Sequence, residues 1–174
     1  MIGFENRELH TPRLTIRLAV EQDKSALWAL LQDPVVTRPA GFDPILTAEE
    51  FDLFFSGLTE YRTGLAILAG NDLIGYVRVN KEELDQPELA DKRLVSLGFV
   101  IGKPYQNRGY GTEMLGAMTA YLKERFDYCV ADHFANNLPS QRIIEKCGYR
   151  FLEEYTWPFE HLEGQEKLLR SYIF

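Results

Sequence analysis

Hydrophobic and polar residues recur along this chain with two spacings, one typical of strands and one typical of helices. The stretch 13–20 alternates between the two kinds and predicts a strand. A helix is expected next, with Asp23 as its N-cap and Pro34 as the residue that ends it. The apolar face of this helix is predicted to consist of Leu27, Leu30 and Leu31.

A second helix and a hairpin are predicted after this first pair of elements. Thr47 is followed three residues later by Glu50, the capping-box pattern that opens a helix. The buried stripe of that helix is expected to be Phe51, Phe54, Phe55 and Leu58. The stretch 65–80 then predicts two short strands joined at Gly70-Asn71-Asp72, a typical hairpin turn.

The second half of the chain alternates apolar strands with amphipathic helices. The run 94–101 is apolar enough to predict a strand buried on both faces. A helix is expected after Gly111, because apolar residues follow at helical spacing. These residues are Met114, Leu115, Met118, Tyr121 and Leu122. A strand at 127–134, a short helix within 140–149 and closing strands at 150–157 and 167–174 complete the prediction.

This order of elements predicts one mixed-sheet α/β domain that spans residues 1–174. The strand–helix–strand unit across 94–134 implies a right-handed parallel crossover, whereas the hairpins imply antiparallel neighbours. No internal repeat, low-complexity tract or linker interrupts the sequence. We therefore expect a central twisted sheet of about six or seven strands flanked by about four helices.

Composition and charge narrow the class of protein. The chain has 174 residues, of which 45% are hydrophobic and 26% are charged, as in ordinary globular proteins. No apolar run approaches the roughly 20 residues that span a bilayer, and the first residues do not resemble a secretory signal, so a cytoplasmic location without a membrane partner is expected. The net charge of -7 argues against a nucleic-acid partner, which needs a basic surface.

Cysteines and histidines do not suggest a metal site. Cys129 and Cys147 lie in apolar surroundings without companions at metal-binding spacing, and they are expected to be core thiols. The histidines are widely scattered, at His10, His133 and His161. The acidic stretch 81–93 is predicted to be a solvated loop, with steering of a cationic substrate as the alternative.

The candidate chemistry lies in the stretch QNRGYG, at residues 106–111, where a predicted strand turns into a predicted helix. A helix N-terminus exposes unpaired N–H groups, and glycines before it let the backbone approach an anion closely. On the glycines alone, a phosphate cradle and a plain tight turn fit equally well. The phosphate loop of nucleotide hydrolases is excluded because its lysine is missing, and the dinucleotide fingerprint is excluded because Met114 stands where its third glycine belongs.

A third kind of cradle fits, because residues 106–111 match the Gln/Arg-x-x-Gly-x-Gly/Ala motif of the GNAT superfamily of N-acetyltransferases. The stretch NLPSQRIIEKCGY, at 137–149, resembles the second signature of that family. The stretch TPRLTIR, at 11–17, and Thr112-Glu113 resemble the branch that contains the ribosomal-protein N-terminal acetyltransferases. The resemblance covers about residues 11–172, which would form the core of the domain.

The resemblance implies a site for acetyl-coenzyme A as co-substrate, with no metal. Backbone N–H groups would bind its pyrophosphate, from Gln106, Asn107, Arg108, Gly109, Tyr110, Gly111 and Thr112. The preceding strand would bind the pantetheine arm through the backbone of Phe99, Val100 and Ile101, and the strand 127–134 would splay away to leave a slot. Asn137 and Ser140 match positions that face this arm, and their ordinary structural roles would be a turn and a helix N-cap.

The chain departs from the family at the positions expected to carry acid–base chemistry. Ile144 stands where many members have a tyrosine acid, so Ser140 or, as the weaker candidate, Tyr149 would take that role. Ser96 stands where close relatives often have a glutamate. His133 is a candidate base or proton relay, with a packed core histidine as the alternative. A backbone N–H of residues 99–101 is the expected oxyanion donor.

The resemblance therefore predicts an N-acetyltransferase that moves an acetyl group directly to a primary amine in a ternary complex. The acceptor would be a protein N-terminal amine or a small molecule such as a polyamine or amino-sugar. The alternative is a binding or regulatory module that holds acyl-coenzyme A without turnover. Aromatic residues within 23–62 are expected to be mostly core, with a subset forming an acceptor wall. Both a monomer and a homodimer are compatible with the sequence.

Overall fold

A computed structural model describes residues 7–158 and 166–174, and His161 lies outside these described residues. The strands are β1 (Leu9–His10), β2 (Thr15–Leu18), β3 (Gly64–Ala69), β4 (Asp72–Glu82), β5 (Leu94–Ile101), β6 (Tyr128–Phe134), β7 (Arg150–Pro158) and β8 (Glu166–Ile173). The helices are α1 (Lys24–Leu31), α2 (Pro34–Thr37), α3 (Ala48–Glu60), α4 (Tyr110–Leu122) and α5 (Leu138–Lys146). Short 3-10 turns are η1 (Glu21–Asp23), η2 (Arg38–Ala40), η3 (Pro87–Leu89) and η4 (Lys103–Tyr105).

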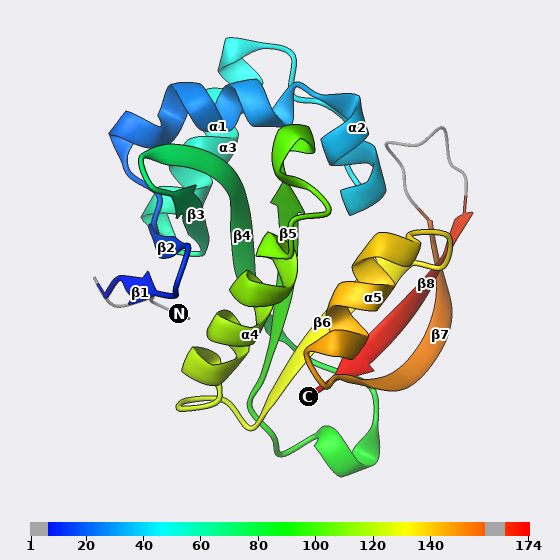
Figure 1. The fold of residues 1–174 in the computed structure, drawn as a ribbon. Coiled ribbons are helices and arrows are strands. Elements are labelled where there is room, and N and C mark those ends of the chain that lie inside the picture. Colours follow the sequence, from blue (N-terminus) through cyan, green and yellow to red (C-terminus); the bar gives the residue numbers. More distant parts are fainter. Residues whose placement is uncertain (1–6, 159–165) are drawn as a thin grey trace.

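The strands form one mixed sheet in the order β1-β2-β3-β4-β5-β6-β8-β7, which confirms the predicted fold class (Figure 1). Every neighbouring pair is antiparallel except β5 and β6, the two strands of the predicted crossover. The described residues contain one strand and one helix more than the upper expectation, since the short β1 and α2 carry little sequence signal.

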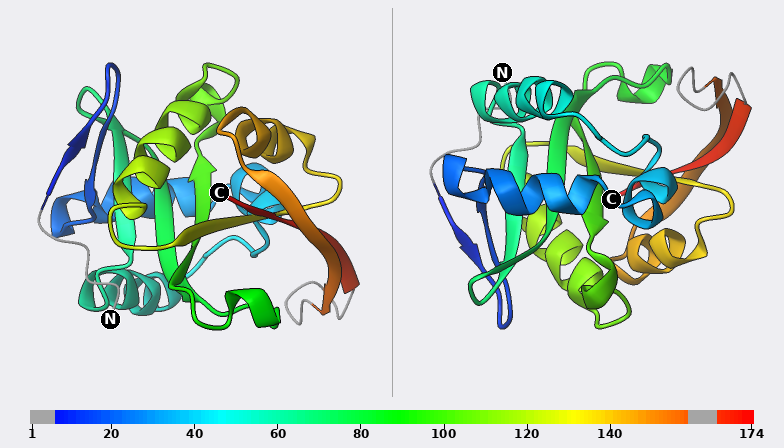
Figure 2. Two further views of the ribbon diagram at one scale, coloured as in Figure 1. Left: turned by 90° about the horizontal axis from the view of Figure 1, so that it is seen from below. Right: turned by 90° about the horizontal axis from the view of Figure 1, so that it is seen from above.

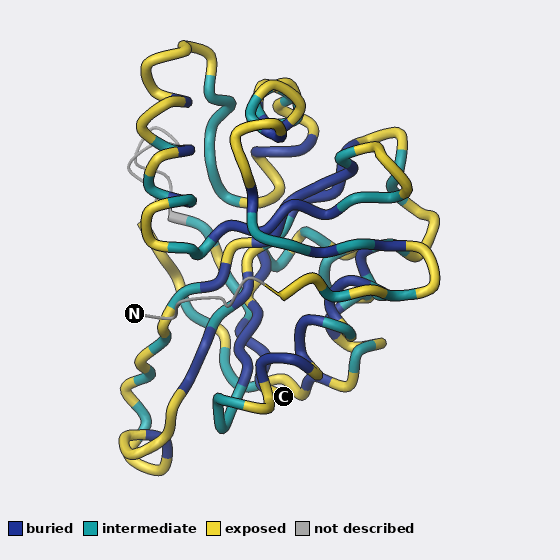
Figure 3. The backbone as a smooth tube through the Cα atoms, turned by 90° about the vertical axis from the view of Figure 1, so that its left-hand side faces the viewer, coloured by how far each residue is buried: buried dark blue, intermediate teal, exposed yellow. Residues whose placement is uncertain are grey.

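Helices cover both faces of this sheet, and α3 and α4 lie on opposite sides of it in both views of Figure 2. On one face α4 buries the residues predicted from its spacing, Met114, Leu115, Met118, Tyr121 and Leu122. On the other face Leu27, Leu31, Phe51 and Phe55 pack over Tyr76 and Val100 of the sheet. The buried positions concentrate in the central strands between these two layers, as Figure 3 shows.

The ends of three helices differ from the prediction, and each difference has a local cause. Pro34 does not simply end the first helix: α1 stops at Leu31, and Pro34 begins α2, where proline suits the first position. Asp23 makes no side-chain cap, because its carboxylate instead binds Arg17 at 2.6 Å. The helix α5 begins before Ser140, since Asn137 is its N-cap. The capping box at Thr47 is confirmed.

Candidate active site

The strands β5 and β6 are paired over only three residues, and the site lies where they part. Their register runs from Leu94↔Tyr128 to Ser96↔Val130 and then stops. Figure 1 shows the two strands diverging beyond this point. A cavity of about 1290 Å³ opens between them, and its lining includes the predicted residues Phe99, Val100 and Ile101. The splayed strands therefore leave backbone of β5 facing a space instead of a neighbouring strand.

The glycine loop borders this cavity and has an unusual backbone. Asn107 and Gly109 adopt left-handed conformations, with φ of 60° and 80°. Gly109 is the N-cap of α4 and contributes no side-chain cap. Within the described residues, the backbone N–H groups of Gly109, Tyr110, Gly111 and Thr112 have no hydrogen-bond acceptor. These donors converge at a helix N-terminus, an arrangement that attracts an anion.

Gly111 lets the first turn of α4 approach both the cavity and the neighbouring helix. A Cβ built at this position would lie 2.7 Å from Cδ1 of Ile143 on α5 and 3.8 Å from the ring of Phe99 on β5. Contacts below about 3 Å require a neighbour to shift, so a larger residue would push α4 away from α5 or project into the cavity. The glycine is thus needed for packing as well as for the approach of a ligand.

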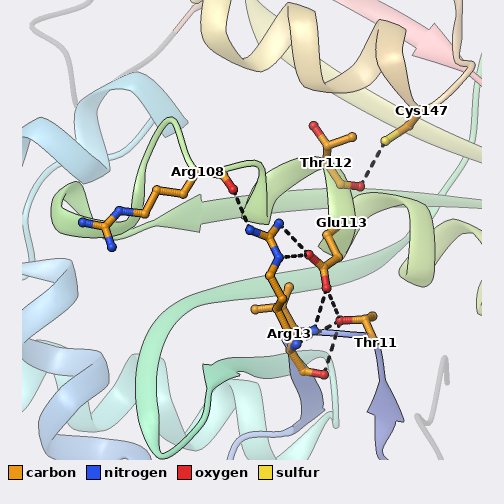
Figure 4. A network of polar contacts seen from close by, with 7 residues as sticks. Thr11, Arg13, Arg108, Thr112, Glu113 and Cys147 are labelled. Carbon is orange, nitrogen blue, oxygen red and sulfur yellow. Dashed lines mark hydrogen bonds and ion pairs between the residues drawn. The ribbon is translucent and has the colours of Figure 1, made fainter.

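A polar clamp from the N-terminal segment holds the loop in place (Figure 4). Glu113 accepts hydrogen bonds from the Thr11 hydroxyl at 2.6 Å and from the Arg13 backbone at 3.0 Å. The Arg13 guanidinium binds the same carboxylate at 2.6 Å, donates to the carbonyl of Arg108 at 2.9 Å and lies over the Tyr110 ring at 4.5 Å. Burial raises the pKa of Glu113, but the bonds from Thr11 and Arg13 outweigh it and leave that pKa below its ordinary value.

The sequence analysis assigned Thr112-Glu113 and the TPRL stretch only by resemblance and missed the clamp that joins them. The available signal was one acid in the first turn of a helix and one base in a distant segment, which does not specify a pair. The predicted cradle residues Gln106, Asn107, Gly109, Tyr110, Gly111 and Thr112 all line the cavity. Arg108 does not line it, and its side chain points away from the clamp in Figure 4.

Asn137 and Ser140 both line the cavity, but the asparagine is already engaged. Its Oδ1 accepts from the Ser140 N–H at 3.2 Å, and its Nδ2 donates to the Pro39 carbonyl at 3.0 Å. Asn137 therefore caps α5 and ties it to η2. The Ser140 hydroxyl has no hydrogen-bond partner among the described residues and is available to a ligand.

His133 also lines the cavity, although it is only 4% exposed. Its Nδ1 lies 2.7 Å from the Phe134 carbonyl, which can only accept, so Nδ1 carries the proton and Nε2 carries the lone pair. Among the described residues this buried Nε2 has no hydrogen-bond partner. The ring packs on Tyr172 with 5.4 Å between the ring centres. Its role as base or relay stays a prediction.

The weaker candidate acid, Tyr149, does not face the cavity. It is buried outside the cavity lining, and its hydroxyl is 2.7 Å from that of Thr119. Burial raises its pKa, with a smaller opposing effect from the Thr119 bond. Ile144, at the family's tyrosine position, is fully buried in the core. Of the aromatic residues expected near the acceptor, Phe42 lines the cavity, whereas Phe51 and Phe55 are core.

The charged residues of the cavity were missed by the sequence analysis, among them Arg78 on β4 and Asp132 on β6. The Tyr155 hydroxyl donates to Asp132 Oδ2 at 3.1 Å. Burial raises the pKa of Asp132, and the hydrogen bonds from Ser171 and Tyr155 oppose that rise. Polar residues at alternate strand positions were the available signal, but without the register they read as ordinary solvent-facing positions.

The cavity is strongly basic in a protein whose net charge is -7. Asp132 is the single acid in its described lining. The bases there are Arg38, Arg78, Lys103, Arg142, Lys146 and Lys167. This charge distribution suits a polyanionic ligand such as a coenzyme with several phosphates. The described residues contain no cluster of three metal-ligating side chains.

Comparisons with known proteins agree with this geometry. A family model described as acetyltransferase (GNAT) domain matches residues 13–150. A GNAT-family acetyltransferase from Bacillus anthracis is similar in structure, with a TM-score of 0.81 at 22% identity over 97% of this chain and 98% of that one. Comparison with curated proteins gave no significant match.

Two further similar structures are acetyltransferases of the ribosomal protein L7/L12. One, from Salmonella typhimurium, modifies its N-terminal serine and has a TM-score of 0.77 at 18% identity, over 97% of this chain and 98% of that one. The other, RimL in complex with coenzyme A, has a TM-score of 0.77 at 17% identity over 97% of each chain. At such identities these likenesses describe the fold. Within the described residues no helix is long and apolar enough to span a membrane.

Proposed function

The chain belongs to the acetyltransferase (GNAT) family, and we propose that it moves an acetyl group from acetyl-coenzyme A directly to a primary amine held in the same cavity. The observation that carries this proposal is the set of four unpaired N–H groups at the start of α4, beside a basic cavity between parted strands. The residues present fit the coenzyme, because its pyrophosphate needs convergent donors and its pantetheine arm needs an unpaired strand edge.

The binding roles follow from position in the lining. The N–H groups of Gly109 to Thr112 would hold the pyrophosphate, with Gln106 and Asn107 shaping the loop. The side chain of Gln106 donates to the Ile101 carbonyl at 2.9 Å, which fixes the loop to the end of β5. The backbone of Phe99 to Ile101 would pair with the pantetheine arm as an added strand. Lys103, Arg142 and Lys146 would add positive charge for the phosphates.

The chemistry requires a donor for the oxyanion, an acid for the leaving thiolate and a group that accepts the proton of the amine. A free N–H of residues 99–101 is the proposed oxyanion donor. The Ser140 hydroxyl, which has no partner within the described chain, is the proposed acid. The Nε2 lone pair of His133 is the proposed relay for the proton of the amine.

The acceptor is proposed to be either a protein N-terminal amine or a small amine. The likeness to two L7/L12 acetyltransferases supports the first choice, and the cavity between the parted strands supports the second. We further propose that residues 1–174 act as one domain, with a core at about 11–172. A cytoplasmic location and a monomeric or homodimeric state stay predictions.

Turnover is tested by following free thiol after acetyl-coenzyme A is mixed with the protein and a panel of amines. We expect amine-dependent thiol release that disappears in Gly111→Val and persists in Gly116→Val, since a Cβ at Gly116 meets nothing within 4 Å. Thiol release that no amine accelerates, with acetyl-coenzyme A bound, would instead indicate a module that holds the coenzyme without transfer.

A further inference from the structure

Three residues form a row across the sheet on the acceptor side of the cavity. Arg78 of β4 is the register partner of Gly98 on β5. The last paired residues of β5 and β6 are Ser96 and Val130, so Gly98 and Asp132, each two residues further, lie level where the strands part. The row is thus Arg78, Gly98 and Asp132, and all three line the cavity.

The row faces the α1 and α3 side of the sheet, away from the α4 side that carries the glycine loop. Side chains alternate along a strand, so Arg78 shares a face with Tyr76, and Gly98 shares a face with Val100. Tyr76 and Val100 pack in the cluster under α1 and α3. At this strand fork, the place where β5 and β6 part, the α4 side therefore presents the glycine loop to the cavity, and the α1 and α3 side presents the row.

The centre of the row is open. A Cβ built at Gly98 meets no heavy atom within 4 Å, and the residue is exposed. A glycine there leaves a depression between the side chains of Arg78 and Asp132. An acceptor of small width can lie over Gly98 with one end toward each of these side chains.

The two ends of the row carry opposite charges, and only the negative end is hydrogen-bonded within the described chain. The exposed Arg78 guanidinium has no ion pair and no hydrogen bond within the described chain. Asp132 is held by the hydroxyls of Tyr155 and Ser171, which leave part of its carboxylate facing the cavity. An unpaired guanidinium in a cavity offers a planar, forked donor set that suits a carboxylate or a phosphonate.

The geometry points to an acceptor that bears an anionic group in addition to its amine: Arg78 binds the anionic group, and Asp132 receives the proton of the amine. This inference rests on the proposed transferase function and specifies its substrate class. A polyamine would place a second ammonium beside Arg78, where like charges repel, so such polycations are disfavoured.

The substrate ammonium gives one proton to the Asp132 carboxylate, which later releases it to solvent. The freed nitrogen lone pair attacks the acetyl carbonyl carbon, and a C–N bond forms. The C–S bond then breaks, the Ser140 hydroxyl gives its proton to the departing thiolate and takes the remaining excess proton from nitrogen, so the products are the amide, free thiol and one proton.

The test compares acids with their neutral amides under identical conditions. Steady-state kcat/KM is measured by thiol release for glycine and glycinamide, β-alanine and β-alaninamide, γ-aminobutyrate and its amide, and a peptide pair that begins with aspartate or asparagine, with spermidine as the cationic probe. We expect at least one acid to exceed its amide by about tenfold or more, the effect of one charge-assisted hydrogen bond.

Variants of Arg78 test whether the row causes the preference for acids over amides. Arg78→Gln should lower kcat/KM of the preferred acid about tenfold and bring the acid-to-amide ratio close to one, and Arg78→Lys should restore part of the ratio. Lys81→Gln is the matched control, because Lys81 lies on the same strand outside the cavity lining and pairs with Glu83. It removes the same charge and should leave the ratio unchanged.

The outcomes separate this inference from the proposed function. If amines accelerate thiol release but no acid exceeds its amide, or spermidine is the best substrate, the anionic-acceptor inference is wrong and the transferase assignment stands. An acid preference that survives Arg78→Gln also overturns it. If acetyl-coenzyme A itself does not bind, the proposed function fails first.

Discussion

The two sides of the strand fork are built in opposite ways. On the coenzyme side, the glycine loop is fixed by Arg13, by the Gln106 bond to β5 and by tight packing of Gly111 against Ile143. On the acceptor side, Arg78 is unpaired within the described chain and Gly98 leaves open space. A site for one invariant coenzyme can be rigid and preformed, whereas the acceptor side needs groups that stay free until the acceptor arrives.

The sharpest way to break this contrast is Gly111→Val on the rigid side. Its branched side chain would meet Ile143 and project toward the pyrophosphate donors. We expect acetyl-coenzyme A affinity to fall about a hundredfold by calorimetry, the effect of losing one or two charge-assisted hydrogen bonds. Gly116→Val is the control, and circular dichroism should show both variants folded. Equal affinity in the two variants would contradict the cradle.

Asp132→Asn sharpens the contrast from the other side. Removing the proton acceptor should lower kcat about a hundredfold while the acetyl-coenzyme A dissociation constant stays unchanged. The pH profile supplies a second readout. The native protein needs charged Asp132, so its rate should rise as pH increases through the raised pKa of this residue. This rise is the acid limb of the pH profile, and the variant should lack it.

The groups that titrate or carry charge and share the sheet register or the cavity with Asp132 are Tyr155 and Glu153 on β7, His133 on its own strand, Arg78 across Gly98 and Arg38 on η2. Because His133 is the other candidate base of the cavity, His133→Gln should be profiled beside Asp132→Asn. A limb that persists in Asp132→Asn and vanishes in His133→Gln would transfer the role of base to the histidine.

Glu113→Gln should have a moderate effect, confined to the rigid side. It weakens the clamp with Thr11 and Arg13, so we expect the affinity for acetyl-coenzyme A to fall a few-fold. Because Arg13 is partly exposed, the free energy of unfolding should fall by only about 1 kcal/mol, seen as a lower Tm. The folded-state pKa of Glu113 is lowered, so its stabilisation is present above the unfolded pKa of about 4.3 and is lost as pH falls through the folded value. The difference in Tm between the two proteins should therefore shrink in acid.

Tyr155→Phe should have the smallest effect. The Tyr155 hydroxyl donates to charged Asp132 at 3.1 Å, and its loss removes one interaction that favours the charged form. The rise of the rate with pH should move to higher pH, with kcat at high pH within about threefold of native. A limb that stays in place would mean that this bond does not influence the reacting carboxylate.

The same contrast explains what could be predicted from the sequence. The loop was recognisable because its requirements, two glycines and a helix start, are contiguous at residues 106–112. The fold class followed from the spacing of apolar residues, while the short α2 was missed because Pro34 can end one helix and begin another. The row of Arg78, Gly98 and Asp132 was invisible, since it exists only through the register of three strands.

The most direct test of the account is a calorimetric titration of acetyl-coenzyme A into the native protein. The free donors of α4 and the basic cavity predict saturable binding at one site with micromolar or tighter affinity, weakened by added salt because phosphates are bound. No detectable heat, with no protection of the protein against thermal unfolding, would mean that the glycine loop is only a tight turn and would contradict the account.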